Sequence, residues 1–270
     1  MEKVRYHAGD QVGEKEHYKE FWIWENKLLT SIKRETSIGI ETMKMTYNGK
    51  KIQTIDIEKK KIIFSYKNGK IDKIESTGDD GYMKITVKVR DKGDIVQLRY
   101  EMSGNSLVSK NGFEQAASDL LVINRMIMPG YPSEIMQKDF MEQKSTIENS
   151  KIDIVTILVT LQYNDKNIGK QTIENESSNI INVYSYTYDS KKNPFFYSFV
   201  ELLEATVTGA PLFCSQNNIV SFTEESNTSI RTNCTYKYDS KNWPVSCEKK
   251  TVYDPNFLSS YSLETWTYTY

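Results

Sequence analysis

The 270-residue sequence is poor in histidine, cysteine and proline, and this scarcity removes several classes of chemistry. Its two histidines, His7 and His17, lie in the polar first 19 residues. Neither stands near a nucleophile motif such as G-x-S-x-G. We therefore assign no catalytic residue, no metal site and no other cofactor from the sequence.

Long hydrophobic runs are also missing. No stretch approaches the roughly 20 apolar residues of a membrane-spanning helix. The opening residues, M-E-K-V-R-Y-H-A-G-D, lack the apolar region of a signal peptide. Taken literally, this start predicts a cytoplasmic protein. If a leader was removed from a longer precursor, the start says nothing about location.

Charge of one sign is not in excess. The chain has 35 basic and 36 acidic residues, interspersed, for a formal net charge of −1. Such a balance creates no long-range field that would attract nucleic acid or an anionic membrane surface. We expect no nucleic-acid partner.

The three cysteines, Cys214, Cys234 and Cys247, show no C-x-x-C spacing for zinc or redox chemistry. Cys234 and Cys247 stand on the two arms of one predicted hairpin. A cross-strand disulfide is one hypothesis, and it requires Cα atoms within about 7 Å of each other. Buried free thiols are the other hypothesis, and the one we favour.

Tyrosine is plentiful, with 18 residues against 13 glycines and 6 prolines. Two segments, Tyr184–Pro194 and Asn233–Pro244, share a Y-x-Y-D-S-K core and alternate aromatic with small polar residues. Alternation with a period of two predicts a half-buried strand, and a polar cluster ending in proline predicts the turn that stops it. Strand, tight turn, strand is therefore the repeating unit.

The same pattern runs through the first hundred residues. Asn48-Gly49 and Asn68-Gly69 stand between alternating runs, which predicts two-residue type I′ hairpin turns. The run Phe21–Trp24 is apolar at every position, so this strand is expected to be covered on both faces. Ile154–Tyr163 is expected to be the longest strand, with Val155, Ile157, Val159, Leu161 and Tyr163 facing inward.

One segment departs from the strand pattern. Residues 113–128 place apolar side chains at helical spacing, and Pro129-Gly130 follows. We predict an amphipathic helix there, in an insertion at about 112–130. Residues 135–146 are assigned to a strand, with a second short helix as the alternative.

These elements predict an all-β fold with one helix. Short turns between sequential strands make an antiparallel meander, and about a dozen twisted strands tend to curl and close. We expect a barrel or half-barrel, with a two-sheet sandwich as the second choice. Residues 1–19 are expected to be a loosely held polar lead-in, and residues 20–270 a single β domain.

The aromatic residues are the main functional signal. If their face is exposed, Tyr and Trp rings form a stacking surface for sugar rings or a protein partner. The favoured alternative is that they fill the interior, because Ser, Thr and Lys occupy the opposite face. The candidate ligand-binding residues are Trp22, Trp24, Tyr186, Tyr188, Tyr236, Tyr238, Trp243, Trp266 and Tyr268.

Carboxylates offer a weaker signal. Asp189 and Asp239 each follow a Tyr-x-Tyr sequence and are the acids that would suit glycosidase chemistry. An Asp at the start of a turn also caps its own backbone, and this role explains both residues.

The C-terminal third resembles a group of uncharacterised exported lipoproteins of Bacteroidetes bacteria. The resemblance rests on Tyr186-Thr-Tyr-Asp189, Asn193-Pro194-Phe195, Ser215-Gln216-Asn217-Asn218, Tyr236-Lys-Tyr-Asp239 and Trp266-Thr-Tyr-Thr-Tyr270. It covers about 130–270, and over 20–110 only the strand and turn rhythm is similar.

The resemblance implies a porin-shaped β-barrel fold and export through a lipoprotein leader, to the periplasm or the cell surface. Membrane attachment would come only through a lipid anchor that this sequence does not contain. It implies no activity and no catalytic residues. Three functions stay open: a non-enzymatic domain that binds a glycan or an envelope protein, an envelope enzyme acting on glycans, and a structural module.

Overall fold

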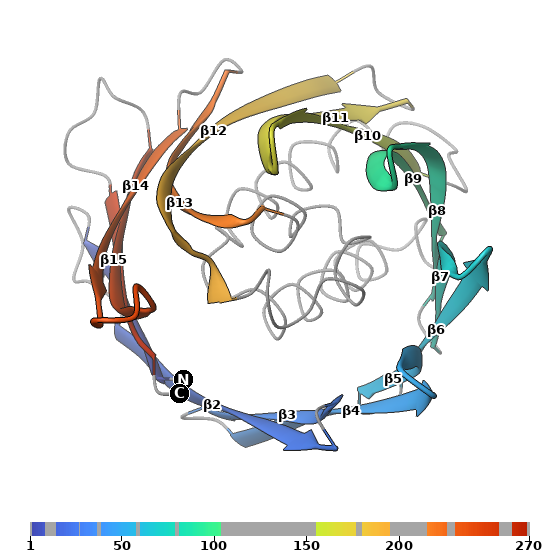
Figure 1. Cartoon of the computed structure of the whole chain (residues 1–270), viewed down its shortest axis with the longest axis horizontal. Helices are drawn as coiled ribbons and strands as arrows, with labels where there is room; N and C mark the ends of the chain where they lie inside the picture. Colours follow the sequence, from blue (N-terminus) through green and yellow to red (C-terminus); the bar gives the residue numbers. More distant parts are fainter. Residues whose placement is uncertain are drawn as a thin grey trace.

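The computed structural model forms a closed antiparallel barrel of sixteen strands among its described residues (Figure 1). It describes residues 2–8, 15–26, 28–36, 39–57, 60–78, 81–103, 155–176, 180–194, 215–225, 230–253 and 261–268. The barrel confirms the expected antiparallel all-β class, and no sandwich of two sheets is formed by the described strands.

Eight strands come from the first 91 residues: β1 Glu2–Ala8, β2 Lys15–Glu25, β3 Leu28–Thr36, β4 Gly39–Asn48, β5 Lys51–Ile57, β6 Lys60–Lys67, β7 Lys70–Gly78 and β8 Gly81–Asp91. The other eight are β9 Asp94–Ser103, β10 Val155–Asn164, β11 Asn167–Asn175, β12 Ile180–Lys192, β13 Asn217–Glu224, β14 Ile230–Tyr238, β15 Pro244–Tyr253 and β16 Tyr261–Thr267. The longest is β12, with 13 residues, rather than the 10-residue β10.

Each strand pairs with its neighbours in the chain, and β1 closes the ring by pairing with both β16 and β2. The expectation of a loosely held lead-in over residues 1–19 is therefore wrong, because these residues supply β1 and the first part of β2. Val4, Tyr6 and Ala8 alternate with charged residues or histidine, a period of two that the polar composition of the segment obscured.

Five hairpins at one end of the barrel share a sequence pattern. An aromatic residue or arginine precedes the turn, and five positions later an Ile or Leu pairs with it across a register shift. The pairs are Trp24 with Leu29, Tyr47 with Ile52, Tyr66 with Ile71, Arg90 with Ile95, and Tyr163 with Ile168. We call this end of the barrel the turn rim.

The turns themselves agree only partly with the expected type. Asn68 and Gly69 both have positive φ, 51° and 82°, as a type I′ turn requires. In the preceding hairpin Asn48 is the last strand residue and pairs with Lys51, so the loop is Gly49-Lys50, with Gly49 at φ 62°. The expected turn is thus displaced by one residue.

Tyrosine hydroxyls at the turn rim link each hairpin to the one before it. The Tyr47 hydroxyl donates to the Leu29 carbonyl at 2.7 Å, and the Tyr66 hydroxyl donates to the Ile52 carbonyl at 2.8 Å. In the position that corresponds to Tyr66, Arg90 donates to the Ile71 carbonyl at 2.9 Å. These bonds satisfy carbonyl groups that a register shift takes out of the ladder.

The inner face of the wall is packed. On β3 to β10 its buried side chains are almost all apolar, and most are less than 5% exposed. They include Leu29, Ile32, Met43, Ile52, Ile55, Ile62, Ile71, Ile74, Ile85, Ile95, Leu98, Val159 and Leu161. The alternation expected in Ile154–Tyr163 is confirmed by its buried Ile157, Val159 and Leu161.

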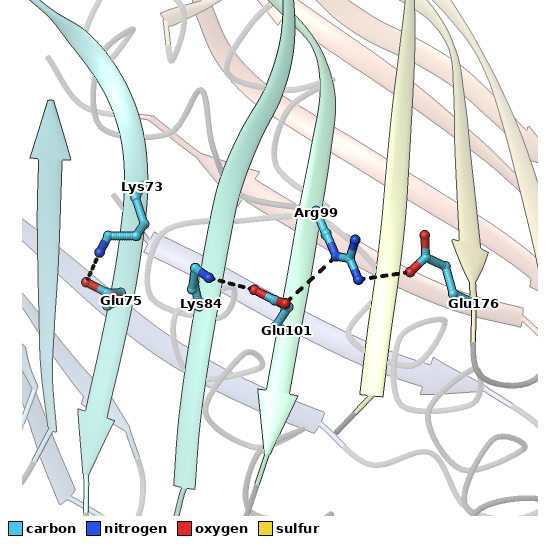
Figure 2. A network of polar contacts seen from close by, with 6 residues as sticks. All are labelled: Lys73, Glu75, Lys84, Arg99, Glu101 and Glu176. Carbon is cyan, nitrogen blue, oxygen red and sulfur yellow. Dashed lines mark hydrogen bonds and ion pairs between the residues drawn. The ribbon is translucent and has the colours of Figure 1, made fainter. Parts of the chain in front are cut away.

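The outer face carries charges that pair across and along strands (Figure 2). Lys84 Nζ lies 2.8 Å from Glu101 Oε2, and Arg99 contacts Glu101 at 3.9 Å and Glu176 at 3.4 Å. Lys73 and Glu75 form a further pair on β7, at 2.8 Å. We call this set the ion-pair belt.

The helix expected at residues 113–128 and the strand expected at residues 135–146 lie outside the described residues. Within the described ranges, no helix is long and apolar enough to cross a membrane.

Candidate binding site

The Tyr-rich strands build a part of the inner wall that differs from the rest. On β11 to β15, buried positions hold polar side chains where β3 to β10 hold aliphatic ones. We call these residues the polar sector: Gln171, Asn175, Asn182, Tyr184, Tyr186, Glu224, Thr232, Lys249 and Thr251. All are 7% exposed or less.

Strand register brings the members of this sector into rows. Gln171 pairs with Tyr184, and Tyr184 pairs with Glu224 on the next strand. Because directly opposite residues share a face, these side chains line one strip of the inner wall. A second row joins Tyr186, through Phe222, to Thr232 and then to Thr251.

Hydrogen bonds fix several of these groups. The Tyr186 hydroxyl donates to Gln171 Oε1 at 2.8 Å, and the Thr232 and Thr251 hydroxyls bond each other at 2.9 Å. The Tyr186 and Phe222 rings lie 5.8 Å apart between centroids, in a tilted arrangement. Buried polar groups held in this way present a rigid pattern of donors and acceptors.

Two charged side chains belong to the sector. Lys249 is 1% exposed, and Glu224 is 5% exposed. Burying a charge is costly unless it is paired and hydrogen-bonded, so such residues rarely serve packing alone. The sector therefore combines an amine, a carboxyl group, amides and phenols, a set suited to a polar ligand or to polar protein groups.

A cluster of sulfur and aromatic groups lies beside Lys249. Cys247 is fully buried and pairs with Tyr236, whereas Cys234 pairs with Lys249. A hydrogen bond with Cys234, followed by burial, raises the pKa of the Cys247 thiol far above its usual range. Burial, followed by the neighbouring thiols, raises the pKa of the Tyr236 phenol.

The disulfide hypothesis is not met in the structure, where Cys234 and Cys247 form no disulfide. The register places Cys247 opposite Tyr236 rather than opposite Cys234, so the two cysteines are diagonal neighbours. A register difference of two residues, which the sequence could not fix, decides between the two hypotheses. Cys214 lies outside the described residues.

A second polar cluster, at the turn rim, centres on Asp189. Its carboxylate accepts hydrogen bonds from the Tyr238 hydroxyl, from the Lys191 amide at 2.9 Å and from the Asn218 amide at 3.2 Å. The Asn218 side-chain amide donates to it as well, at 3.3 Å. Asp189 thereby joins β12, β13 and β14, and we call this group the Asp189 cluster.

The Ser-Gln-Asn-Asn segment is held by the same region. The Ser215 hydroxyl donates to Tyr188 at 2.9 Å and accepts from the Ile168 amide at 3.0 Å. The Asn193 side chain donates to the Ser215 carbonyl at 2.8 Å. Asn217 exchanges two hydrogen bonds with Asn167, each at 3.1 Å. This segment therefore fixes the start of β13 against β11 and β12.

Asp239, the counterpart of Asp189 in the repeated motif, has a purely local role. Its Oδ1 accepts from the Lys241 amide at 2.8 Å and from the Trp243 amide at 2.9 Å. It caps the turn, as the sequence suggests. Asp189 caps Lys191 in the same way and bridges two further strands, a difference that the shared motif does not reveal.

The sequence-predicted aromatic residues fall into three groups. Tyr186 and Trp266 are buried at 6% and 3% exposure. Trp22, Tyr188 and Tyr268 are partly buried against the core. The third group is half-buried and lies near the polar sector or the turn rim: Tyr236, Tyr238 and Trp243.

Trp24 is the exception among the candidates, because 45% of it is exposed. It lies on β2, which β16 and β1 separate from β15 of the polar sector (Figure 1). The buried rings of the Tyr-rich strands therefore do not form an open stacking platform with Trp24. Phe21 and Ile23, expected to be covered, are likewise exposed at 46% and 43%.

Sequence reasoning missed Gln171, Asn182, Glu224 and Lys249. Each stands at an inward position of an alternating strand, where an apolar residue is the usual choice. That break in the pattern is the signal that could have found them. Within the described part of the chain, no group of three metal-ligating side chains is close enough to hold an ion.

No protein-family model matches this chain, and no curated protein matches it. Among solved structures, it is similar to a porin-like protein from Bacteroides uniformis ATCC 8492, with a TM-score of 0.52 and 12% identity over 99% of this chain and 95% of that one. A porin-like protein from Bacteroides vulgatus ATCC 8482 gives a TM-score of 0.47 and 9% identity over 98% and 97%. The first likeness supports a porin-like fold and nothing beyond the fold.

Proposed function

We propose that this chain is a non-enzymatic β-barrel domain of the bacterial cell envelope that binds a polar ligand or partner through its polar sector. The observation that supports it most is the division of the inner wall into an aliphatic part and a polar, Tyr-rich part. Filling space alone needs no buried Lys249 or Glu224, and a wall with only a structural role is more stable with aliphatic residues there.

We further propose that the outer wall faces water. The ion-pair belt places Lys73, Lys84 and Arg99 on that face. A Lys or Arg facing lipid at the midplane costs about 2 to 4 kcal/mol, so these three alone would cost roughly 6 to 12 kcal/mol. In water, the same groups keep their hydration and gain a little from pairing.

The proposed location is the periplasm or the cell surface, with attachment through a lipid anchor on a longer precursor. The support is the resemblance of the Tyr-x-Tyr-Asp and Ser-Gln-Asn-Asn segments to exported Bacteroidetes lipoproteins. The porin-like fold shared with the Bacteroides uniformis protein is consistent with it. Sequencing the gene's upstream region tests it, because a lipobox cysteine before this segment is expected and its absence would contradict the anchor.

The ligand class we propose is a glycan or an envelope protein. Buried phenols, amides and one charge of each sign match sugar hydroxyl groups and polar peptide groups. The enzyme alternative has less support, since Glu224 is the only buried carboxylate among the described residues and catalysis by two carboxylates needs a second one.

A binding screen tests the proposal. Wild-type protein and the variants Gln171→Leu and Lys249→Met are applied to a glycan array and to an envelope-protein pull-down. We expect a ligand that binds wild type and loses at least tenfold in affinity with either variant. A matched control, Ile74→Val in the aliphatic part of the wall, should bind normally. If a ligand binds both polar variants as tightly as wild type, its site lies outside the polar sector and the proposal is wrong.

A further inference from the structure

Four lysines stand at the tips of two neighbouring hairpins of the turn rim: Lys50 and Lys51 on the β4–β5 hairpin, and Lys67 and Lys70 on the β6–β7 hairpin. Lys50, Lys67 and Lys70 are exposed, and Lys51 is half-buried. Among the described residues, no carboxylate lies within ion-pair distance of any of their ammonium groups. This part of the rim therefore concentrates four lysines, with the exposed Glu25 of the adjoining β2–β3 hairpin as the nearest acid along the rim on that side.

The contacts that these lysines do make hold them at the rim. The Lys51 ammonium lies 5.1 Å from the centroid of the Tyr66 ring on the next hairpin. The Lys70 ammonium donates to the Gly93 carbonyl of the hairpin after that, at 3.1 Å. Both side chains reach sideways along the rim, so their charges stay at its edge.

The adjoining hairpin, between β2 and β3, exposes apolar side chains. Phe21, Ile23 and Trp24 are 46%, 43% and 45% exposed. Lys33 Nζ lies 5.8 Å from the centroid of the Phe21 ring. Phe21 and Ile23 stand on the outer wall below the turn rim, whereas Trp24 pairs with the buried Leu29 across the register shift and so stands at the inner edge of the rim.

Topology places all these residues at the same end of the barrel. In an up-and-down meander, the turns that follow β2, β4 and β6 lie on one rim. Neighbouring tips on that rim are about 10 Å apart, two strand spacings of about 4.8 Å. This is close to the Debye length of about 8 Å at physiological salt, so the lysine potentials add.

We propose that this edge of the turn rim docks on an anionic phospholipid surface. The four lysines would lie over the headgroups, where each Lys near an anionic leaflet is attracted. Trp24, Ile23 and Phe21 would enter the interfacial region beside them, as Trp and aliphatic side chains do at membrane surfaces. The contact is peripheral and leaves the outer wall in water.

Several observations favour lipid over other anions. The charges spread over two hairpins, which exceeds the reach of a small anion. The exposed aliphatic side chain of Ile23 can bury apolar surface among acyl chains, whereas a nucleic acid or an acidic glycan offers it no apolar contact. The next hairpin carries Asp91 and Asp94, which limits the contact to one side of the rim. The overall charge of −1 hides this local clustering.

The test is a vesicle-binding titration with two charge-matched variants. The rim variant replaces Lys50, Lys51, Lys67 and Lys70 with Gln. The control replaces Lys61, Lys237, Lys241 and Lys250 with Gln, four exposed lysines away from this edge and from the apolar side chains of the β2–β3 hairpin. Vesicles are phosphatidylcholine with or without about one-third phosphatidylglycerol. Circular dichroism checks that each variant is folded.

We expect binding to the anionic vesicles only, weakened by salt. Each lysine contributes about fivefold, so the rim variant should lose several hundredfold in affinity while the control loses less than tenfold. Trp24→Ser should abolish the blue shift of tryptophan fluorescence that vesicles cause and should weaken binding. Equal losses in both lysine variants, no binding to anionic vesicles, or binding to heparin or DNA without binding to vesicles would each overturn the proposal. Failure here leaves ligand binding by the polar sector untouched.

Discussion

Asp189 and Asp239 occupy the same place in a repeated Y-x-Y-D-S-K motif, yet replacing each with asparagine should have unequal effects. Asp239 uses only Oδ1, which accepts from two turn amides. An asparagine keeps that oxygen and caps turns as well as aspartate does. We expect Asp239→Asn to cost less than about 1 kcal/mol of unfolding free energy.

Asp189 uses both oxygens. Oδ1 accepts from the Lys191 and Asn218 amides, while Oδ2 accepts from the Tyr238 hydroxyl and the Asn218 side chain. In Asp189→Asn an NH₂ group replaces Oδ2 and faces two donors. Hydrogen bonds to a charged group contribute about 1.5 to 3 kcal/mol each, so we expect a loss of roughly 2 to 4 kcal/mol.

Urea unfolding, followed by tryptophan fluorescence, measures both variants against wild type. The difference should appear as a lower midpoint for Asp189→Asn with an unchanged slope, since the surface exposed on unfolding is the same. Equal midpoints for the two variants would refute the reasoning. So would an Asp189→Asn variant within about 0.5 kcal/mol of wild type, since surface changes lie in that range.

Three further outcomes follow from the same geometry. Tyr66→Phe removes the hydroxyl that donates to the Ile52 carbonyl, so it should lower the unfolding free energy by about 0.5 to 1.5 kcal/mol in the same urea assay. An unchanged midpoint would show that this hydrogen bond does not stabilise the fold. Cys247, whose thiol pKa is raised by its hydrogen bond with Cys234 and by burial, should resist iodoacetamide at pH 8 in native protein and react in urea; native labelling would contradict its burial. Burial and the Asp189 carboxylate raise the pKa of Tyr238, so its contribution to stability is complete below the ordinary tyrosine pKa of about 10 and falls as pH rises above it. Tyr238→Phe should therefore have a shallower loss of stability between about pH 10 and 11 than wild type, and identical slopes would refute this assignment.

The strand pattern was predictable because it depends on local chemistry. Alternation over Ile154–Tyr163 and the Asn68-Gly69 turn specify backbone conformations that hold whatever lies around them. Closure was not predictable in full. The pairing of β1 with β16 joins residues at opposite ends of the chain, and the polar composition of residues 1–19 hid the strand that makes it.

The candidate site shows the same limit. Inward positions can be read from alternation, but the register that sets Tyr184 opposite Glu224, or Cys247 opposite Tyr236, depends on turns and bulges. Asp189 and Asp239 look alike in sequence because their local turns are alike. Asn218, contributed by another strand, makes the difference, and nothing near Asp189 in sequence announces it.

The central claim is that the outer face of this barrel, with its ion-pair belt, lies in water, and that the polar sector of the inner wall binds a polar ligand or partner. Sedimentation of the purified chain in buffer without detergent tests the first half directly. We predict a monodisperse, folded species whose sedimentation coefficient does not change when detergent micelles are added. Aggregation without detergent, together with a species that sediments with bound micelle, would mean that the ion-pair belt does not face water and would contradict the account.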